Sequence, residues 1–155
     1  MEQGQVTPLE LRLGYTFANT DLLITALTHK TYAFEAATPL EFNERLEFLG
    51  DSILNFVVAE QLYSTNRFFS EGELTRRRAI GVNNKLLADV AKQLGIGEFL
   101  FLGRGEQKQG GSTNSSNLAN ALEAVIGAIY LDAGLEAARD FILQKVFTAD
   151  LFFLK

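Results

Sequence analysis

The 155-residue sequence contains no cysteine and no tryptophan, and it has only one histidine and two prolines. Without cysteine the chain can form neither a disulfide bond nor a thiolate metal site, and this composition is typical of proteins in a reducing cytoplasm. No apolar run approaches the roughly 20 residues that cross a bilayer, and no basic-then-apolar signal segment opens the chain. The sequence therefore predicts a cytoplasmic protein with no membrane partner.

Positive charge is also scarce, because 14 Lys and Arg face 19 Asp and Glu, for a net charge of −5. This balance argues against a protein that coats nucleic acid nonspecifically. It leaves a nuclease open, since a cluster of acids that binds metal makes a chain more acidic. The hydrophobic fraction of 47% and the length predict one folded domain, residues 1–155, with a proper core.

Apolar residues recur at helical spacing throughout, and no alternating strand pattern is found, so the fold class predicted is all-α. His29, the only histidine, is expected to bond a helix terminus rather than to act in catalysis. Residues 31–40 are expected to connect two helices, and the glycine-rich segment 102–112 to form a mobile surface loop. Helices are predicted from Pro8 to Gly14, from about 20 to 29, over about 41–65, from Ser70 through Arg78, in a further run from Leu86 to Gly95, from 114–116 to about 132, and over 135–147.

The stretch 43–51 places Glu44, Glu47 and Asp51 at spacings that share one helix face within about 60°. Apolar residues surround that face, so much of this helix should be buried. Carboxylates crowded in apolar surroundings repel each other and lose hydration, and a divalent cation would remove that cost. A solvated acidic stripe is the alternative, but an apolar wrap around almost the whole circumference favours a site.

A second helix, residues 118–130, is almost wholly apolar except for Asn120 and Glu123, which lie three residues apart. If this helix faces the acidic one, together they form a carboxylate-rich cage for a hard, oxygen-liganded cation such as Mg²⁺ or Mn²⁺. The lack of histidine or cysteine near the cluster argues against zinc.

These motifs resemble the ribonuclease III family, whose signature is similar to Asn43-Glu44-Arg45-Leu46-Glu47-Phe48-Leu49-Gly50-Asp51. Further similar segments follow in the same order as in the family: 13–17, 26–29, 71–74, 102–106 and 121–132. The resemblance implies a helical nuclease domain that forms a homodimer and cleaves double-stranded RNA. Cleavage would be metal-assisted hydrolysis that leaves 5′-phosphate and 3′-hydroxyl ends, in RNA processing such as rRNA maturation.

The resemblance also implies individual roles. Glu47, Asp51 and Glu123 fall on catalytic metal-ligand positions, and Asn120 falls on the fourth metal position. Auxiliary acidic positions are matched by Glu44 and Glu71, and an aromatic that plugs a pocket of the partner subunit is matched by Phe48. Contacts to RNA phosphates are predicted for the basic residues Arg76, Arg77, Arg78, Arg104 and Lys108.

The sequence departs from the family pattern in two respects. Asn120 stands where the family commonly has Asp, so the cage has one negative charge fewer and metal affinity should drop. Asn120 is thus a natural active variant, the mark of a weakened nuclease, or an engineered replacement, and the intact acids favour an active enzyme. The alternative function is an inactive, ribonuclease III-like RNA-binding protein. The double-stranded-RNA-binding domain that many family members carry does not follow within these residues, so RNA affinity is expected to be modest and salt-sensitive.

Overall fold

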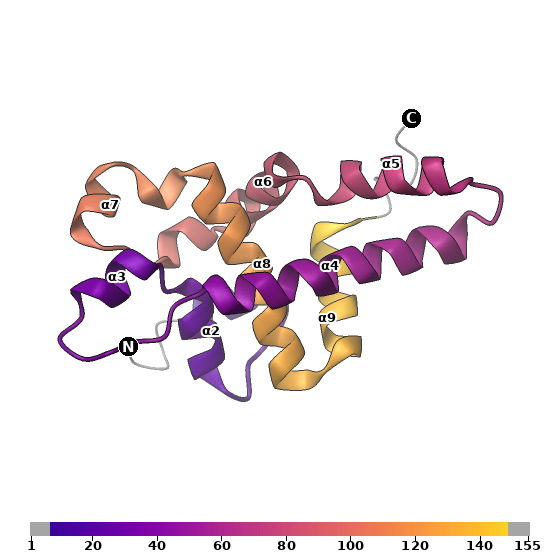
Figure 1. Ribbon diagram of the computed structural model, residues 1–155. Coiled ribbons are helices and arrows are strands. Elements are labelled where there is room, and N and C mark those ends of the chain that lie inside the picture. The colour runs from indigo at the N-terminus through magenta and orange to yellow at the C-terminus, as the bar shows by residue number, and fades with distance from the viewer. Residues whose placement is uncertain (1–6, 149–155) are drawn as a thin grey trace.

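Two long helices cross at the centre of the computed structural model, which describes residues 7–148 (Figure 1). They are α4 (Glu44–Thr65) and α8 (Ser115–Ala133). The other helices are α1 (Thr7–Leu13), α2 (Thr20–Leu27), α3 (Lys30–Glu35), α5 (Glu71–Val82), α6 (Asn84–Leu94), α7 (Arg104–Lys108) and α9 (Leu135–Phe141). Of these, α2, α6 and α9 pack against α8, while α5 lies at one end of the molecule and α3 and α7 lie at the other. Two 3₁₀ turns, Ile96–Phe99 and Gly111–Thr113, and a π-helical turn, Ile142–Val146, complete the described chain.

Two glycines allow α4 and α8 to touch backbone to backbone. A Cβ atom on Gly50 of α4 would overlap the carbonyl oxygen of Glu123 on α8. A Cβ atom on Gly127 of α8 would lie 2.5 Å from the carbonyl oxygen of Leu46 on α4. Only glycine permits so close an approach. The crossing therefore brings the acids of α4 directly beside Glu123.

The core surrounds α8, in which every residue from Ala121 to Ile129 is buried. Burial of a large aliphatic side chain contributes about 1.5–3 kcal/mol, so this helix is a main source of stability. One face of α4 packs against it, and α2 and α6 cover its other sides. The buried residues of α4 are Leu46, Gly50, Ile53, Leu54, Val57, Val58 and Leu62.

Side-chain caps define most helix starts. Ser70 and Asn83 accept hydrogen bonds from the first turns of α5 and α6, and Asn114 does the same for α8. Gly95, with φ of 73°, ends α6 in the left-handed conformation as expected. Asn43 behaves differently, since its side chain donates to the carbonyl of Ala26 at 3.3 Å instead of capping α4. This tie to α2 delays the start of α4 to Glu44, three residues later than predicted.

Two connections predicted to be irregular contain helices. The segment 31–40 was expected to be a connection, but α3 occupies its first half because His29 accepts a hydrogen bond from the Thr31 amide at 3.2 Å. His29 is thus a helix cap, which confirms its predicted structural role. The segment 102–112 contains α7 and is fixed at its start, where the Gly103 amide donates to the Thr31 hydroxyl at 2.9 Å. The prediction of an irregular loop there was wrong, because helical turns occupy most of the segment.

The all-α prediction is confirmed for the described part of the chain. Its one β-type contact is an isolated bridge between Thr28 and Phe101. Within residues 7–148, no helix combines the length and the apolar character that a bilayer crossing requires.

Candidate active site

Seven side chains from three helices line a hollow of about 480 Å³ at the crossing of α4 and α8. We call it the acidic pocket. Five of the residues predicted for the site meet in it, although α4 and α8 are far apart in sequence, and their chemical roles stay predictions. The lining residues are Glu44, Glu47, Phe48 and Asp51 from α4, Asn84 from α6, and Asn120 and Glu123 from α8.

Glu123 is the most deeply buried of these acids, with 6% of its surface exposed. Burial raises its pKa to about 8, and a hydrogen bond to Asp51 and repulsion from Asp51 and Glu47 act in the same direction. The pKa of Glu47 is also raised, first by burial and then by repulsion from Glu44 and Asp51. Without a cation, Glu123 therefore keeps its proton at neutral pH. The pocket has more negative charge than it can stabilise by itself.

The other two acids, Asp51 and Glu44, each contact a polar or charged side chain. Asn55, one turn after Asp51, donates through its side-chain amide to the backbone carbonyl of Asp51 at 2.9 Å and to its Oδ1 at 3.3 Å. Lys30 places its Nζ 3.7 Å from Oε1 of Glu44. The charge of Glu44 is thus partly balanced within the chain, whereas Glu47 and Glu123 have no such cationic partner among the described residues.

The donor set of the acidic pocket suits a hard divalent cation. Glu47, Asp51 and Glu123 supply carboxylate oxygens and Asn120 an amide oxygen, the ligand types that Mg²⁺ and Mn²⁺ prefer. Within residues 7–148, no three acidic or histidine side chains stand close enough to enclose an ion. The residues therefore fit a cation, in an open rather than a preformed cage.

Glu71 does not join the acidic pocket within one chain. It lies in the first turn of α5 and lines a separate hollow between α4 and α5, together with Phe56, Tyr63 and Arg78. Within one chain Glu71 therefore lies apart from the other acids, and its auxiliary role stays a prediction. Sequence order could not reveal this, because α4 is long enough to carry α5 away from the helix crossing (Figure 1).

The predicted RNA-binding residues are split between two parts of the molecule. Arg76, Arg77 and Arg78 lie on α5, whereas Arg104 and Lys108 lie on α7 at the opposite end (Figure 1). On α5, Arg76 and Arg77 both form ion pairs with Glu73, at 2.8 and 2.6 Å. These bonds lower the pKa of Glu73 to about 2.

Arg77 is committed further to internal contacts. Its guanidinium also lies over the Phe69 ring, 4.5 Å from the ring centre. Arg76, Arg104 and Lys108 are exposed. The fold thus presents basic side chains on either side of the acidic pocket rather than in one patch.

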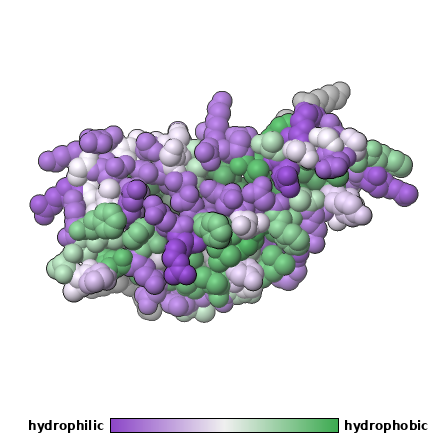
Figure 2. All heavy atoms as spheres, in the orientation of Figure 1, coloured by the Kyte–Doolittle hydropathy of each residue, from purple (hydrophilic) through white to green (hydrophobic). Residues whose placement is uncertain are grey.

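Phe48 corrects the picture of an α4 wrapped in apolar neighbours. Its side chain is 78% exposed beside Glu47, and Phe56 and Tyr63 on the same helix are 51% and 75% exposed. At 100° per residue the three rings project within an arc of about 80°. Figure 2 shows hydrophobic surface along α4 and below it, interrupted by hydrophilic atoms. One face of α4 therefore faces the core, and another carries exposed aromatic rings.

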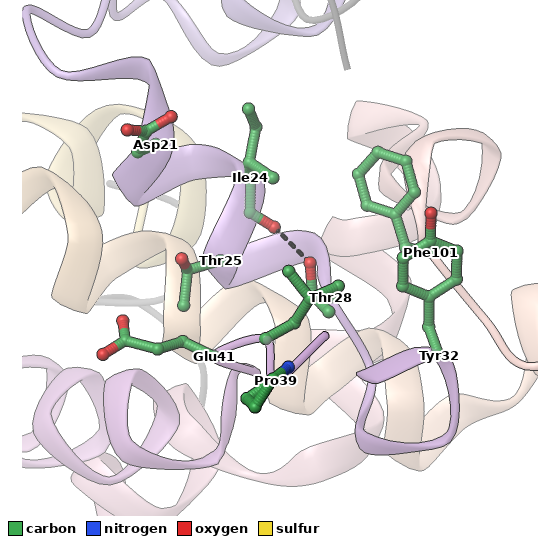
Figure 3. Close-up of a pocket in the computed structure, with 9 residues that line it drawn as sticks. Asp21, Ile24, Thr25, Thr28, Tyr32, Pro39, Glu41 and Phe101 are labelled. Atoms are coloured by element: carbon green, nitrogen blue, oxygen red, sulfur yellow. Dashed lines mark hydrogen bonds between the residues drawn. The ribbon is translucent and has the colours of Figure 1, made fainter. Parts of the chain in front are cut away.

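A separate hollow lies where the chain after α3 passes the end of α2 (Figure 3). Asp21 and Glu41 stand on one side of it, and the rings of Tyr32 and Phe101 stand on the other. The Thr28 hydroxyl donates to the Ile24 carbonyl at 2.7 Å and so has its own partner. The hollow shares no lining residue with the acidic pocket and brings no set of catalytic groups together.

Two side chains near the acids, those of Asn55 and Asn84, were not predicted from the sequence. Asn55 was detectable, because it follows Asp51 by four residues and so lies on the same helix face. Asn84 was harder to detect from the sequence, because its only distinguishing feature is that it follows Asn83 at the start of a helix. Only the packing of α6 against α8 places it beside acids from two other helices.

Comparison with known proteins places the chain in a family. A family model described as ribonuclease-III-like matches residues 19–150. Ribonuclease 3 of Thermobifida fusca (strain YX) is 50% identical over 143 residues, which is 89% of this chain and 59% of that protein. Ribonuclease 3 of Streptomyces coelicolor (strain ATCC BAA-471 / A3(2) / M145) is 52% identical over 136 residues, 88% of this chain and 49% of that protein.

A similar fold is found in a solved structure of the nuclease domain of ribonuclease III from Campylobacter jejuni. That structure is described as showing structural flexibility in a region involved in dimer formation. It matches with a TM-score of 0.85 and 42% identity, over 91% of this chain and 95% of that one. The chain thus spans about half to three fifths of the curated relatives but nearly all of the solved domain. It belongs to the ribonuclease-III-like family and has the all-α fold of that family's nuclease domain.

Proposed function

We propose that this chain is an endoribonuclease domain that cleaves double-stranded RNA by metal-assisted hydrolysis, leaving 5′-phosphate and 3′-hydroxyl ends. The observation that carries the proposal is the convergence of Glu47, Asp51, Asn120 and Glu123 in one pocket of a ribonuclease-III-like chain. RNA processing such as rRNA maturation, in the cytoplasm, is the corresponding biological role. Discrimination of RNA from DNA would come from A-form groove shape and 2′-hydroxyl contacts.

In this proposal, Glu47, Asp51, Glu123 and Asn120 hold Mg²⁺, or Mn²⁺ in its place. When bound, such a cation supplies acidified water and stabilises negative charge on the phosphate and the leaving oxygen. The protein's own contribution is positioning. Asn55 fixes the orientation of Asp51, and the buried carboxyl of Glu123 must release its proton before it can act as a ligand.

A homodimer completes the proposal. The exposed Phe48 stands at the edge of the acidic pocket and of a larger apolar hollow of about 860 Å³. If the Phe48 ring of each subunit enters the hollow of the other, the exposed aromatic face of α4 becomes buried. Apolar residues that line this hollow include Leu22, Leu40, Phe42, Leu46, Leu49 and Leu131.

The test is cleavage of an end-labelled RNA duplex by the purified 155-residue chain in Mg²⁺, with and without a chelator. Cleavage is expected only with Mg²⁺, and Asp51→Ala or Glu123→Ala should slow it at least about a thousandfold because each removes a ligand. Circular dichroism should show that both variants keep the helical fold. Undiminished cleavage by both variants would refute the proposed site.

Asn120 favours a second candidate function, an RNA-binding protein without catalysis, because it leaves the pocket with one acid fewer than the family pattern. Under that alternative the duplex binds in the same experiment but is not cut at any Mg²⁺ concentration.

A further inference from the structure

Asn83 and Asn84 are adjacent in sequence but differ in their bonding. The side chain of Asn83 accepts a hydrogen bond from the Leu86 amide at 2.9 Å and donates to the Ile80 carbonyl at 2.9 Å. It is therefore fully used in joining α5 to α6. The side chain of Asn84 makes no hydrogen bond with any residue between 7 and 148, although it lines the acidic pocket.

The position of Asn84 is set by a rigid element. It is the first residue of α6, and Leu87 and Ala88, which follow it by three and four residues, are buried in the core. On a helix these three residues lie on the same side. The packing that holds α6 against α8 therefore also directs Asn84 toward the acidic pocket.

The acids of the pocket cannot supply the hydrogen-bond donors that an RNA phosphate requires. Its ionised carboxylates can only accept hydrogen bonds, and an RNA phosphate also offers only acceptors. Once the acids are ionised around a bound cation, the side-chain donors in the lining are the two amides, Asn84 and Asn120. Asn120 lies one turn before Glu123 on the same helix and belongs to the set of metal-ligating oxygens. Asn84 approaches from a different helix and is free to donate.

We propose that the side-chain amide of Asn84 donates a hydrogen bond to a non-bridging phosphate oxygen of the RNA bound at the acidic pocket. Asn84 is then a substrate-binding residue that positions the phosphate opposite Asp51 and Glu123. This inference rests on the proposed cleavage of RNA. It assigns the two amides of the pocket to different partners, Asn84 to the phosphate and Asn120 to the cation.

Replacement of each amide by a carboxylate separates these roles. In Asn84→Asp the donor is lost and a negative charge faces the phosphate, so binding of RNA should weaken. In Asn120→Asp the added charge faces the cation, so binding of Mg²⁺ should tighten. The same chemical change therefore has opposite consequences at the two positions.

The experiment compares wild type with Asn84→Ala, Asn84→Asp and the control Gln93→Ala, an exposed residue near the far end of α6. It measures kcat and KM for a short RNA duplex at saturating Mg²⁺, and the Mg²⁺-induced rise of Tm without RNA. Asn84→Ala should raise KM about tenfold, as expected for a lost hydrogen bond to a charged group, and leave kcat within about twofold. Asn84→Asp should raise KM more, and Gln93→Ala should not change it.

The Mg²⁺-induced rise of Tm should stay at the wild-type value in all three variants. A wild-type KM in Asn84→Ala would overturn the inference. So would an Asn84→Asp variant with a larger Mg²⁺-induced rise of Tm and faster cleavage at low Mg²⁺, because Asn84 would then face the cation. If the wild type does not cut RNA, the proposed function fails; weaker duplex binding by Asn84→Ala than by Gln93→Ala would then still support the phosphate contact, and equal binding would refute it.

Discussion

The two helices that build the acidic pocket, α4 and α8, differ in their surroundings. From Ala121 to Ile129, α8 is covered on all sides. In contrast, α4 buries one face and exposes Phe48, Phe56 and Tyr63 on another. The fixed helix contributes Asn120 and Glu123, whereas the two-sided helix contributes Glu47 and Asp51. The difference indicates that α8 serves as the rigid half of the site, while α4 joins the site to a surface that is available to a second subunit.

Because of this difference, substitutions in different parts of the two helices should affect different properties of the protein. Changes at their contact should reduce stability, because α8 has no free space around it. Changes on the exposed face of α4 should affect assembly and leave the monomer folded. Changes to the polar groups of α8 should alter cation binding.

The largest effect is expected for Gly50→Ala, which forces a methyl group against the Glu123 carbonyl. Because backbone rather than a flexible side chain must move, the loss of unfolding free energy should be about 3 kcal/mol or more. That corresponds to a fall in Tm of roughly 6–12 °C for a chain of this size. Urea and thermal unfolding measure it. The matched control is Gly105→Ala in α7, where a Cβ meets nothing within 4 Å, and its stability should be unchanged or slightly increased.

The next largest effect is expected for Phe48→Ala, which removes the aromatic ring nearest the acidic pocket from the exposed face of α4. If this face forms the dimer, its dissociation constant should rise at least about a hundredfold, as for a central interface aromatic. Analytical ultracentrifugation measures the change, and the Tm of the monomer should stay close to wild type. Phe68→Ala is the control, since Phe68 is even more exposed than Phe48 but lies beyond the end of α4. Equal dissociation constants for the two variants would remove Phe48 from the interface.

Asn120→Asp tests the fixed helix. It adds a fourth acid to the proposed metal ligands Glu47, Asp51 and Glu123, and the added charge should tighten Mg²⁺ binding about tenfold, which is about 1.4 kcal/mol. Cleavage at low Mg²⁺ should rise accordingly. Isothermal titration with Mg²⁺ and cleavage across a Mg²⁺ series are the measurements. Identical Mg²⁺ dependence in the variant and the wild type would show that residue 120 does not contact the cation.

The smallest effect concerns pH and the buried carboxyl of Glu123. Its folded-state pKa of about 8 lies above the ordinary 4.5, so the folded state holds a proton that the unfolded state has lost. This stabilisation is complete below about pH 4.5 and disappears as the pH rises to about 8. The Tm of metal-free protein should therefore fall by a few degrees between pH 5.5 and pH 8.5, relative to the trend in Glu123→Gln. Saturating Mg²⁺ should reduce the fall, and an equal slope in both proteins would contradict the raised pKa.

The sequence was sufficient to predict every member of the acidic pocket except Asn84, but not the surroundings of these residues. Helical spacing placed Glu44, Glu47 and Asp51 on one face, and the isolated polar pair Asn120 and Glu123 pointed to the partner helix. Spacing reports which residues share a face, but which neighbour covers that face depends on distant parts of the chain.

The arrival of Asn84 from α6 was missed for that reason, whereas the exposure of Phe48 agrees with the role that the resemblance implied for it. The short helix α3 was missed because its start depends on a cap from His29, a residue type that is uncommon in that role. Sequence resemblance identified Glu71 as an auxiliary acidic residue without locating it relative to the other acids, and the structure places it in a separate hollow.

The backbone contact at Gly50 and Gly127 also affects which sequence changes such a domain can tolerate during evolution. Because main-chain atoms set the spacing between α4 and α8 at this point, that spacing does not depend on the size of any side chain there. Aliphatic residues elsewhere in the core can exchange for one another, with losses that are usually below about 1.5 kcal/mol, without moving the acids apart. Substitutions can therefore accumulate in the hydrophobic core without changing the arrangement of the acids.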